Sequence, residues 1–181
     1  MNYYGASELA NAFRTVRNNT LEAAREIPAD AYDFTPVAGC RNLEKLLTHI
    51  ALAHRFQYRV HAEDRLSSFE GFDFPALMAE LAAEEAQPRT KDEVVAMLEH
   101  EGEVWETFLR GLDDDFLGEK VSFPVEFDAP PKSRFEMIMS VKEHEMHHRG
   151  QLMVVQRMLG IVPHLTRQRE ERMAAREAER A

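Results

Sequence analysis

The chain has 181 residues, of which 44% are hydrophobic and 30% charged, a composition typical of one globular domain and unlike that of a disordered chain. Its formal net charge of −10 is opposite to the charge that non-specific phosphate binding needs, so we expect no nucleic-acid partner. Cys40 is the only cysteine, which excludes an internal disulfide. With no secretory signal and no apolar run near the ~18 residues of a membrane helix, we expect a cytoplasmic protein without membrane association.

The first half of the chain predicts two long helices. One covers about 6–27, with apolar residues at helical spacing, and ends before Pro28. The next stretch, PADAYDFTPVAGCR at 28–41, contains two prolines and a glycine and is expected to be irregular. The second helix is expected over about 42–61.

The middle of the chain predicts a short helix followed by a long one. The segment FPALMAELAAEEA, 74–86, reads as a short extra helix with Pro75 in its first turn. The third long helix begins after Thr90, which can cap it while the side chain of Glu93 reaches back, as in a capping box. It continues to about Gly111.

The last long helix is expected over about 133–159, ended by Gly160 and Pro163. The preceding stretch, 119–132, is short and rich in proline, so an extended loop is predicted there. The tail, 164–181, is almost wholly charged residues and alanine and has no apolar face, which indicates a solvated helix or a frayed end.

These elements predict an all-α fold with a four-helix bundle, a short extra helix between the second and third long helices, and a charged C-terminal tail. We expect the bundle domain to cover 1–163 and the charged helix or tail to cover 164–181. A four-helix core suits helices of roughly 20 residues, which are about 30 Å long.

Two histidines of the last long helix take positions that the pattern assigns to the core. His144 and His148 lie four residues apart, on one face of the helix. Buried side by side, two neutral imidazoles need separate partners and two charged ones repel each other. A divalent cation resolves both problems, because neutral imidazole is the commonest metal ligand; the alternative is a pair of core histidines with satisfied hydrogen bonds. Their stripe is Val141, His144, His148, Leu152, Val155 and Leu159.

A third ligand would have to come from another helix. His49 and His54 in the second helix are five residues apart and cannot both face one site. The pattern favours His49, whose stripe is apolar on both sides, and places His54 and His61 at a flank or at the surface. We expect His100 and His164 to be exposed as well.

The neighbours of these histidines allow two interpretations each. Gln151, three residues after His148, either orients a ligand as an outer partner or is a solvated glutamine. Gly150 inside a helix costs roughly 1 kcal/mol against alanine, which is tolerable if another element packs closely there. Glu145, beside His144 in sequence, is expected to be solvated or ion-paired.

Two segments resemble the DinB-like (DinB/YfiT) family of four-helix-bundle metalloproteins: TPVAGCRNLEKLLTHIALAH at 35–54 and HEMHHRGQLMVVQRMLG at 144–160. The resemblance extends over about 5–163. It implies a metal triad of His49, His144 and His148 holding a divalent ion, nickel or zinc; His147 is not carried over. Three imidazoles accept several metals, so the residues alone do not select between these two.

The resemblance also implies a chemistry. Characterised members of the family include transferases that use a low-molecular-weight thiol, such as bacillithiol, mycothiol or glutathione, and a thiol-dependent isomerase. It therefore implies a metal-dependent S-transferase that acts on a small electrophilic substrate, with the thiol as cosubstrate and Cys40 without a role. Relatives often pair, so a homodimer is also an expectation.

Two other functions remain open from the residues. Three histidine ligands leave a coordination position free, as catalytic metal sites do, and a bound water could be activated for hydrolysis. The apolar stripe carries no carboxylate to act as a base, which ranks a metal-dependent hydrolase second. The third hypothesis is a non-catalytic, stress-related protein that binds a metal or ligand. No catalytic residue beyond the metal ligands is assigned.

Overall fold

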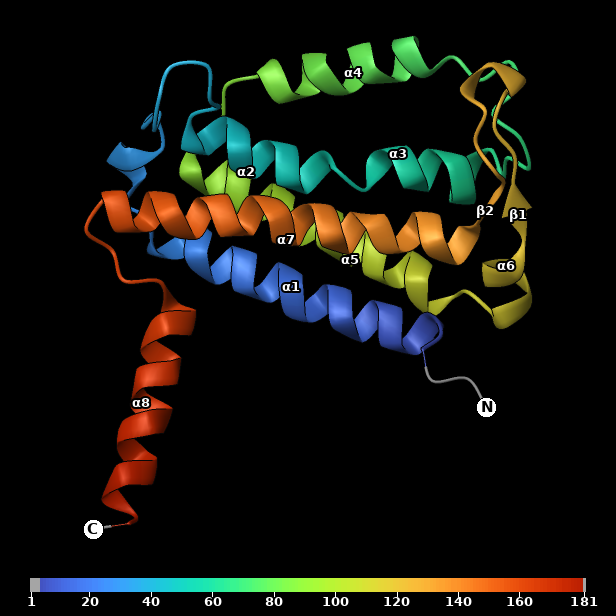
Figure 1. Cartoon of the computed structure of the whole chain (residues 1–181). Helices are drawn as coiled ribbons and strands as arrows, with labels where there is room; N and C mark the ends of the chain where they lie inside the picture. The colour runs from blue at the N-terminus through green and yellow to red at the C-terminus, as the bar shows by residue number, and fades with distance from the viewer. Residues whose placement is uncertain (1–3, 181) are drawn as a thin grey trace.

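The computed structural model describes residues 4–180 and confirms the all-α bundle (Figure 1). α1 and α2 each pack against both α5 and α7, so α2 and α7 are neighbours in the bundle although about 90 residues separate them in sequence. The four long elements are α1 (Ala6–Glu26), α2 (Leu43–Leu52) with its continuation α3 (Arg55–Tyr58), α5 (Lys91–Arg110) and α7 (Arg134–Met158).

Smaller elements close the top and one end of the bundle (Figure 1). The expected extra helix is α4 (Phe74–Ala86), which packs on α2. The stretch 119–132 is more ordered than a loop, because it forms a two-strand antiparallel ladder in which Lys120 pairs with Ser133. The remaining short elements are η1 (Ala29–Ala31), α6 (Asp114–Gly118), β1 (Lys120–Val121), η3 (Val125–Phe127) and β2 (Lys132–Ser133).

Side-chain caps start the helices where the sequence indicates. The capping box at the start of α5 is confirmed, with the backbone N–H of Thr90 donating to Glu93 and that of Glu93 donating back to the Thr90 hydroxyl. Asn42 accepts from the backbone of Lys45 and so starts α2. α7 ends before Gly160, whose φ of +77° is a conformation that glycine adopts without strain.

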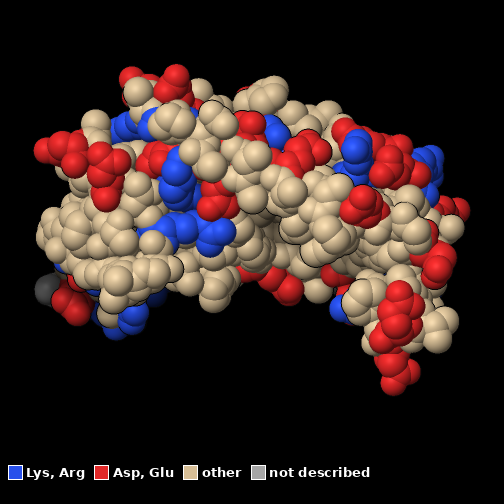
Figure 2. Space-filling model, turned by 90° about the horizontal axis from the view of Figure 1, so that it is seen from above, with Lys and Arg blue, Asp and Glu red and all other residues tan. Residues whose placement is uncertain are grey.

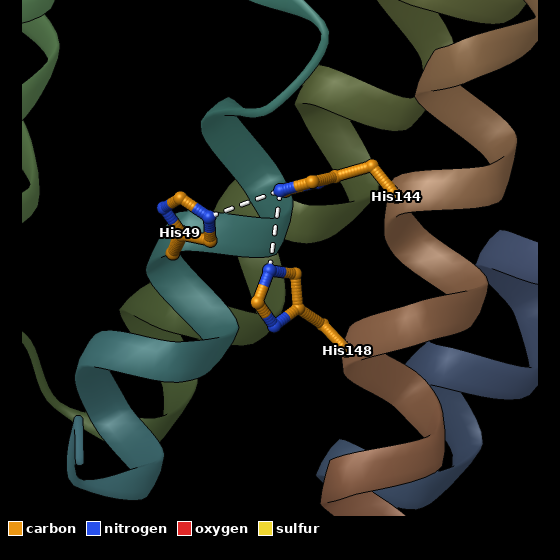
Figure 3. A group of neighbouring side chains, drawn as sticks. All are labelled: His49, His144 and His148. Atoms are coloured by element: carbon orange, nitrogen blue, oxygen red, sulfur yellow. Dashed lines mark hydrogen bonds between the residues drawn. The ribbon is translucent and has the colours of Figure 1, made fainter.

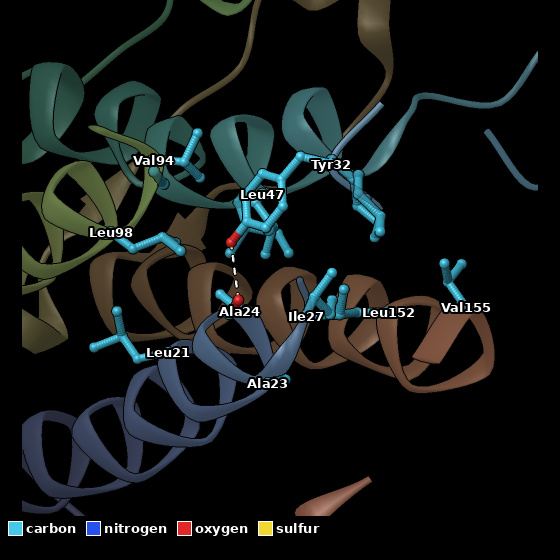
Figure 4. Packing of buried hydrophobic residues seen from close by; sticks show 14 residues of the cluster. Leu21, Ala23, Ala24, Ile27, Tyr32, Leu47, Val94, Leu98, Leu152 and Val155 are labelled. Carbon is cyan, nitrogen blue, oxygen red and sulfur yellow. Dashed lines mark hydrogen bonds between the residues drawn. The ribbon is translucent and has the colours of Figure 1, made fainter. Parts of the chain in front are cut away.

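Aliphatic side chains from all four long elements fill the core around the bundle axis (Figure 4). Leu47, Leu98 and Leu152 are fully buried there, and Ile27 closes the cluster at the end of α1. The hydroxyl of Tyr32 donates to the carbonyl of Ala24 at 2.9 Å, which ties the connector after α1 to the helix. A core of this kind stabilises the bundle without help from a metal.

One ion pair is buried in the middle of the bundle. The guanidinium of Arg17 donates to both carboxylate oxygens of Glu145, with Nε–Oε1 and Nη2–Oε2 distances of 3.0 Å, and also to the carbonyl of Leu98 at 2.6 Å. The side chains of Arg17 and Glu145 are 4% and 1% exposed. Gly102 of α5 gives the arginine room, because a Cβ there would lie 3.0 Å from its Cγ.

The second helix differs from the continuous 42–61 helix that the sequence predicts. α2 stops at Leu52, and the chain continues through α3 into a π-helical turn, η2 (Arg59–Glu63). His54 and His61 are each only 1% exposed, so the prediction that they lie at a flank or at the surface was wrong. His54 follows the fully buried Leu47 and Ile50 at helical spacing, so its ring lies on the face that points to the core.

Polar partners make the burial of these two histidines tolerable. His54 Nε2 lies 3.3 Å from a carboxylate oxygen of Glu101. His61 accepts from Arg134 through Nδ1 at 2.9 Å and donates through Nε2 to the side-chain carbonyl of Gln57 at 3.0 Å. Burial lowers the pKa of both rings to about 4, so both are neutral near pH 7.

The C-terminal tail forms α8 (His164–Ala178), which projects from the bundle (Figure 1). The prediction that His164 is exposed was wrong, because its ring is 1% exposed and its Nε2 lies 3.2 Å from the side-chain oxygen of Asn19. Arg167 forms an ion pair with Glu26 of α1. Beyond this first turn the helix is exposed, as its charged composition predicts.

The surface is mixed in charge on the face that Figure 2 shows, where basic side chains form no continuous field. Within residues 4–180, no helix is both long enough and apolar enough to cross a membrane.

The buried ion pair predicts a large and asymmetric effect of mutation. Glu145→Ala leaves the Arg17 charge buried without its counter-ion and should destabilise the metal-free protein by about 3–5 kcal/mol, whereas the double variant Arg17→Met/Glu145→Leu should recover most of that loss. Urea unfolding measures both. Glu99→Ala, which removes the exposed partner of Arg25, is the control and should change stability by less than about 1 kcal/mol. Equal effects of Glu145→Ala and Glu99→Ala would contradict the prediction.

Candidate metal centre

Three histidine side chains converge between α2 and α7 (Figure 3). The Nε2 atom of His144 lies 3.2 Å from Nε2 of His49 and 3.1 Å from Nε2 of His148. Within residues 4–180, this is the one group of three or more potential ligand residues whose donor atoms all lie within 4.8 Å of one another. The structure therefore brings together the three histidines that the sequence singles out.

The spacing of the three Nε2 atoms suits a shared cation. Two nitrogens that each lie ~2.1 Å from one metal ion are about 3.0 Å apart at an octahedral angle and about 3.4 Å apart at a tetrahedral angle. The two separations from His144, 3.1 and 3.2 Å, fall between these values. His144 therefore lies at a suitable distance from both neighbouring nitrogens, and the donor atoms of all three rings lie within 4.8 Å of one another.

In two of the rings, a hydrogen bond at the outer nitrogen, Nδ1, fixes the tautomer and therefore the direction of the lone pair. His49 Nδ1 lies 2.9 Å from Oε2 of Glu85, a carboxylate that can only accept from it. His148 Nδ1 lies 2.8 Å from the side-chain oxygen Oε1 of Gln151, which also accepts. Each neutral ring therefore carries its proton on Nδ1 and directs the Nε2 lone pair inward, which is the tautomer that metal binding requires.

His144 lies between the other two rings and has no such outer partner. Its buried Nδ1 has no hydrogen-bond partner, and its Nε2 faces two lone pairs while a neutral ring has at most one proton to offer there. Without a cation, His144 can donate its proton to at most one of the two neighbouring nitrogens, which leaves the other close contact without a hydrogen bond. A divalent ion at the centre would satisfy all three nitrogens at once, so the side chains present fit a metal.

The protonation states also fit a metal. Burial lowers the pKa of His144 to about 4, and the neighbouring imidazoles and Arg41 act in the same direction. Burial likewise lowers the pKa of His49 and of His148. The rings are therefore neutral near pH 7, and neutral imidazoles are the form that binds metal ions.

Glu85 is a residue of the candidate site that the sequence did not reveal. It lies on α4, the extra helix, and besides accepting from His49 it is paired with Arg41, whose Nε lies 2.5 Å from Oε1. No motif marks this carboxylate, because a helix rich in glutamate and alanine looks like a solvated cover. Only the packing of α4 on α2 brings it to His49.

Gln151 is the hydrogen-bond partner of His148, the first of the two interpretations that the sequence allowed. Its oxygen accepts from His148 and its amide nitrogen lies 3.2 Å from Nε2 of His147, which is exposed beside the cluster and not part of it. In the part of the chain that the structure describes, no element packs closely against Gly150, because a Cβ there would meet no atom within 4 Å, so close packing does not account for this glycine. Glu145 is ion-paired, one of its two expected states, and its buried partner is Arg17.

Solved structures and a curated relative share this architecture. The YjoA protein of Bacillus subtilis, which is uncharacterized, is 23% identical over 155 residues, or 86% of this chain and 91% of the relative. The crystal structure of this DinB-like protein superposes with a TM-score of 0.61 at 21% identity, over 84% of this chain and 92% of that one. YfiT of the same species, described as a probable metal-dependent hydrolase with an unusual four-helix bundle topology, gives a TM-score of 0.65 at 15% identity, over 89% and 91%.

The family model of the DinB superfamily matches residues 12–152, a range that includes the convergent histidines and most of each of the four long elements of the bundle. The match covers well over half of the chain and agrees with the fold of the solved relatives. This chain belongs to the DinB superfamily.

Proposed function

We propose that the protein is a divalent-metal-dependent enzyme that transfers a low-molecular-weight thiol to a small electrophilic substrate. The observation that carries the proposal is the set of three inward-facing Nε2 atoms, two of which are fixed by outer partners. A site with three protein ligands keeps a coordination position free, whereas structural sites are closed by four. Nickel and zinc both accept three imidazoles, and either ion fits the proposal.

A divalent ion held by these rings would supply the positive charge that lowers the pKa of a thiol or water in the free position. In the transfer, the sulfur of the thiolate forms a bond to carbon, the leaving group departs with the electron pair of its own bond, and the thiol proton passes to solvent. Neutral His49, His144 and His148 add no negative charge, so the full charge of the ion would act on the sulfur. Glu85 and Gln151 hold two of the rings in place.

Hydrolysis is the alternative, and the description of YfiT as a probable metal-dependent hydrolase favours it. Activation of water also calls for a general base near the ion. Glu85 is already engaged by His49 and Arg41, and Glu145 by Arg17. Glu143 is exposed and lies about 100° round α7 from His144, away from the site. Attack by a thiol needs no such base once the thiolate has formed, which is why we place thiol transfer first and hydrolysis second.

Metal content tests the centre itself. After incubation with nickel or zinc and removal of the excess, the wild-type protein should retain about one ion per chain by elemental analysis, and His49→Ala should retain far less while staying folded. The matched control is His147→Ala, which removes an exposed imidazole from α7 and should keep the ion. Equal metal content in the wild type and His49→Ala would refute the assignment.

The hydrogen-bond partners of His49 and His148 predict a partial loss of metal affinity on mutation. Glu85→Leu and Gln151→Leu should each weaken metal affinity by about 10–100-fold, because the ring nitrogens lose the acceptors that set their tautomers. Gln151→Glu keeps an acceptor oxygen and should bind close to the wild-type level. Competition with a chelating dye measures all three. Unchanged affinity in Gln151→Leu would show that Gln151 is only a surface residue.

Activity separates the candidate functions. Metal-loaded protein should conjugate bacillithiol, mycothiol or glutathione to a small alkyl halide faster than the uncatalysed reaction, and His148→Ala should lose that rate, as followed by chromatography of the thioether. A rate no higher than that of His148→Ala would end the transferase proposal. Metal-dependent ester or amide hydrolysis without thiol would favour the hydrolase, and absence of both reactions would favour a binding protein.

A further inference from the structure

A groove opens beside the metal centre, between the connector that precedes α2 and the C-terminal half of α7. Its volume is about 460 Å³, within the ~300–1,000 Å³ typical of small-molecule pockets. Pro36 and the segment 39–41 form one wall, and Leu46 contributes from α2. The opposite wall is α7, from His148 to Met158.

The groove is continuous with the three-histidine cluster. His148 and Gln151 both line it, and the same two side chains bond to each other at 2.8 Å as part of the centre. A molecule in the groove would therefore lie against the ring of a candidate metal ligand. Of the surfaces around the centre, this one offers room for a second reactant next to a thiol bound in the free position.

The walls of the groove are mainly hydrocarbon. Val154 and Met158 are 58% and 53% exposed, and they lie four residues apart on one face of α7. Val155 and Leu46 are buried at its base. Large apolar side chains that are exposed to solvent next to a polar site indicate a surface that binds an apolar group.

The charged side chains around the groove restrict the class of molecule that it can bind. Arg41 is the one charged residue among those that line it, and its guanidinium is already paired with Glu85. No carboxylate lines the walls to attract a cation, and no free cationic side chain is left to attract an anion. An uncharged group suits this environment best.

We propose that this groove binds the electrophilic cosubstrate through an uncharged apolar group, an alkyl chain or an aromatic ring system, with the reactive carbon toward His148. The inference rests on the proposed transferase function for the identity of the occupant. It names the substrate class: compact, neutral electrophiles with a hydrocarbon body. Val154 and Met158 are then residues that determine specificity.

Binding of a neutral fluorescent probe, N-phenyl-1-naphthylamine, to the metal-free protein tests the groove without any reaction. Val154→Glu and Met158→Glu put a charge on its wall at exposed positions and should weaken probe binding at least about tenfold. Val125→Glu, at a position 92% exposed in η3, is the control and should leave binding unchanged. Circular dichroism verifies that the variants are folded.

Kinetics with two electrophiles add a second readout. For benzyl chloride, Val154→Glu should raise KM with little change in kcat, whereas for the small polar electrophile iodoacetamide neither constant should change. The two experiments distinguish a failure of the groove proposal from a failure of the transferase proposal.

Absence of probe binding to the wild type, or equal binding by the wild type and both groove variants, would overturn the groove proposal even if conjugation is seen. Weakened probe binding in the groove variants without conjugation would support the groove as a site for neutral apolar molecules and end the transferase.

Discussion

The candidate metal centre depends on the direction of three imidazole lone pairs. A neutral imidazole has one proton and one lone pair, so its inner nitrogen can bind a cation only if the outer nitrogen carries the proton. Glu85 and Gln151 impose that state on His49 and His148, and burial keeps all three rings neutral. Packing of α2 against α7 then brings His144 Nε2 to 3.2 Å from His49 Nε2 and keeps the donor atoms of all three rings within 4.8 Å of one another.

The rest of the bundle supports this arrangement from a distance. The buried pair of Arg17 and Glu145 joins α1 to α7 one residue from His144, so the helix that carries two of the rings is held in register with its neighbour. The extra helix α4 is more than a cover, because it contributes Glu85 to the outer side of His49. The connector before α2 forms the wall of the groove that leads to His148.

Helix positions and the choice of histidines could be predicted because they depend on local rules. The cap at Thr90, the stop at Gly160 and the apolar stripe around His144 and His148 follow from the periodicity of one helix, and the structure confirms the long helices that they delimit. The predictions for His54 and His61 failed because their stripe faces the core, where Glu101, Gln57 and Arg134 supply polar partners from other positions in the sequence. The prediction for His164 failed because its partner, Asn19, is distant in the sequence.

The sequence by itself therefore determined the class of fold, the ends of the long helices that carry clear caps or stops, and the shared face of His144 and His148, since each of these follows from residues within a few turns of one another. The tertiary structure alone decided that Glu85 meets His49, that Arg17 meets Glu145, and that an apolar groove opens beside His148. Those relations join side chains on different helices. Their distances depend on how the helices pack, which no local pattern encodes.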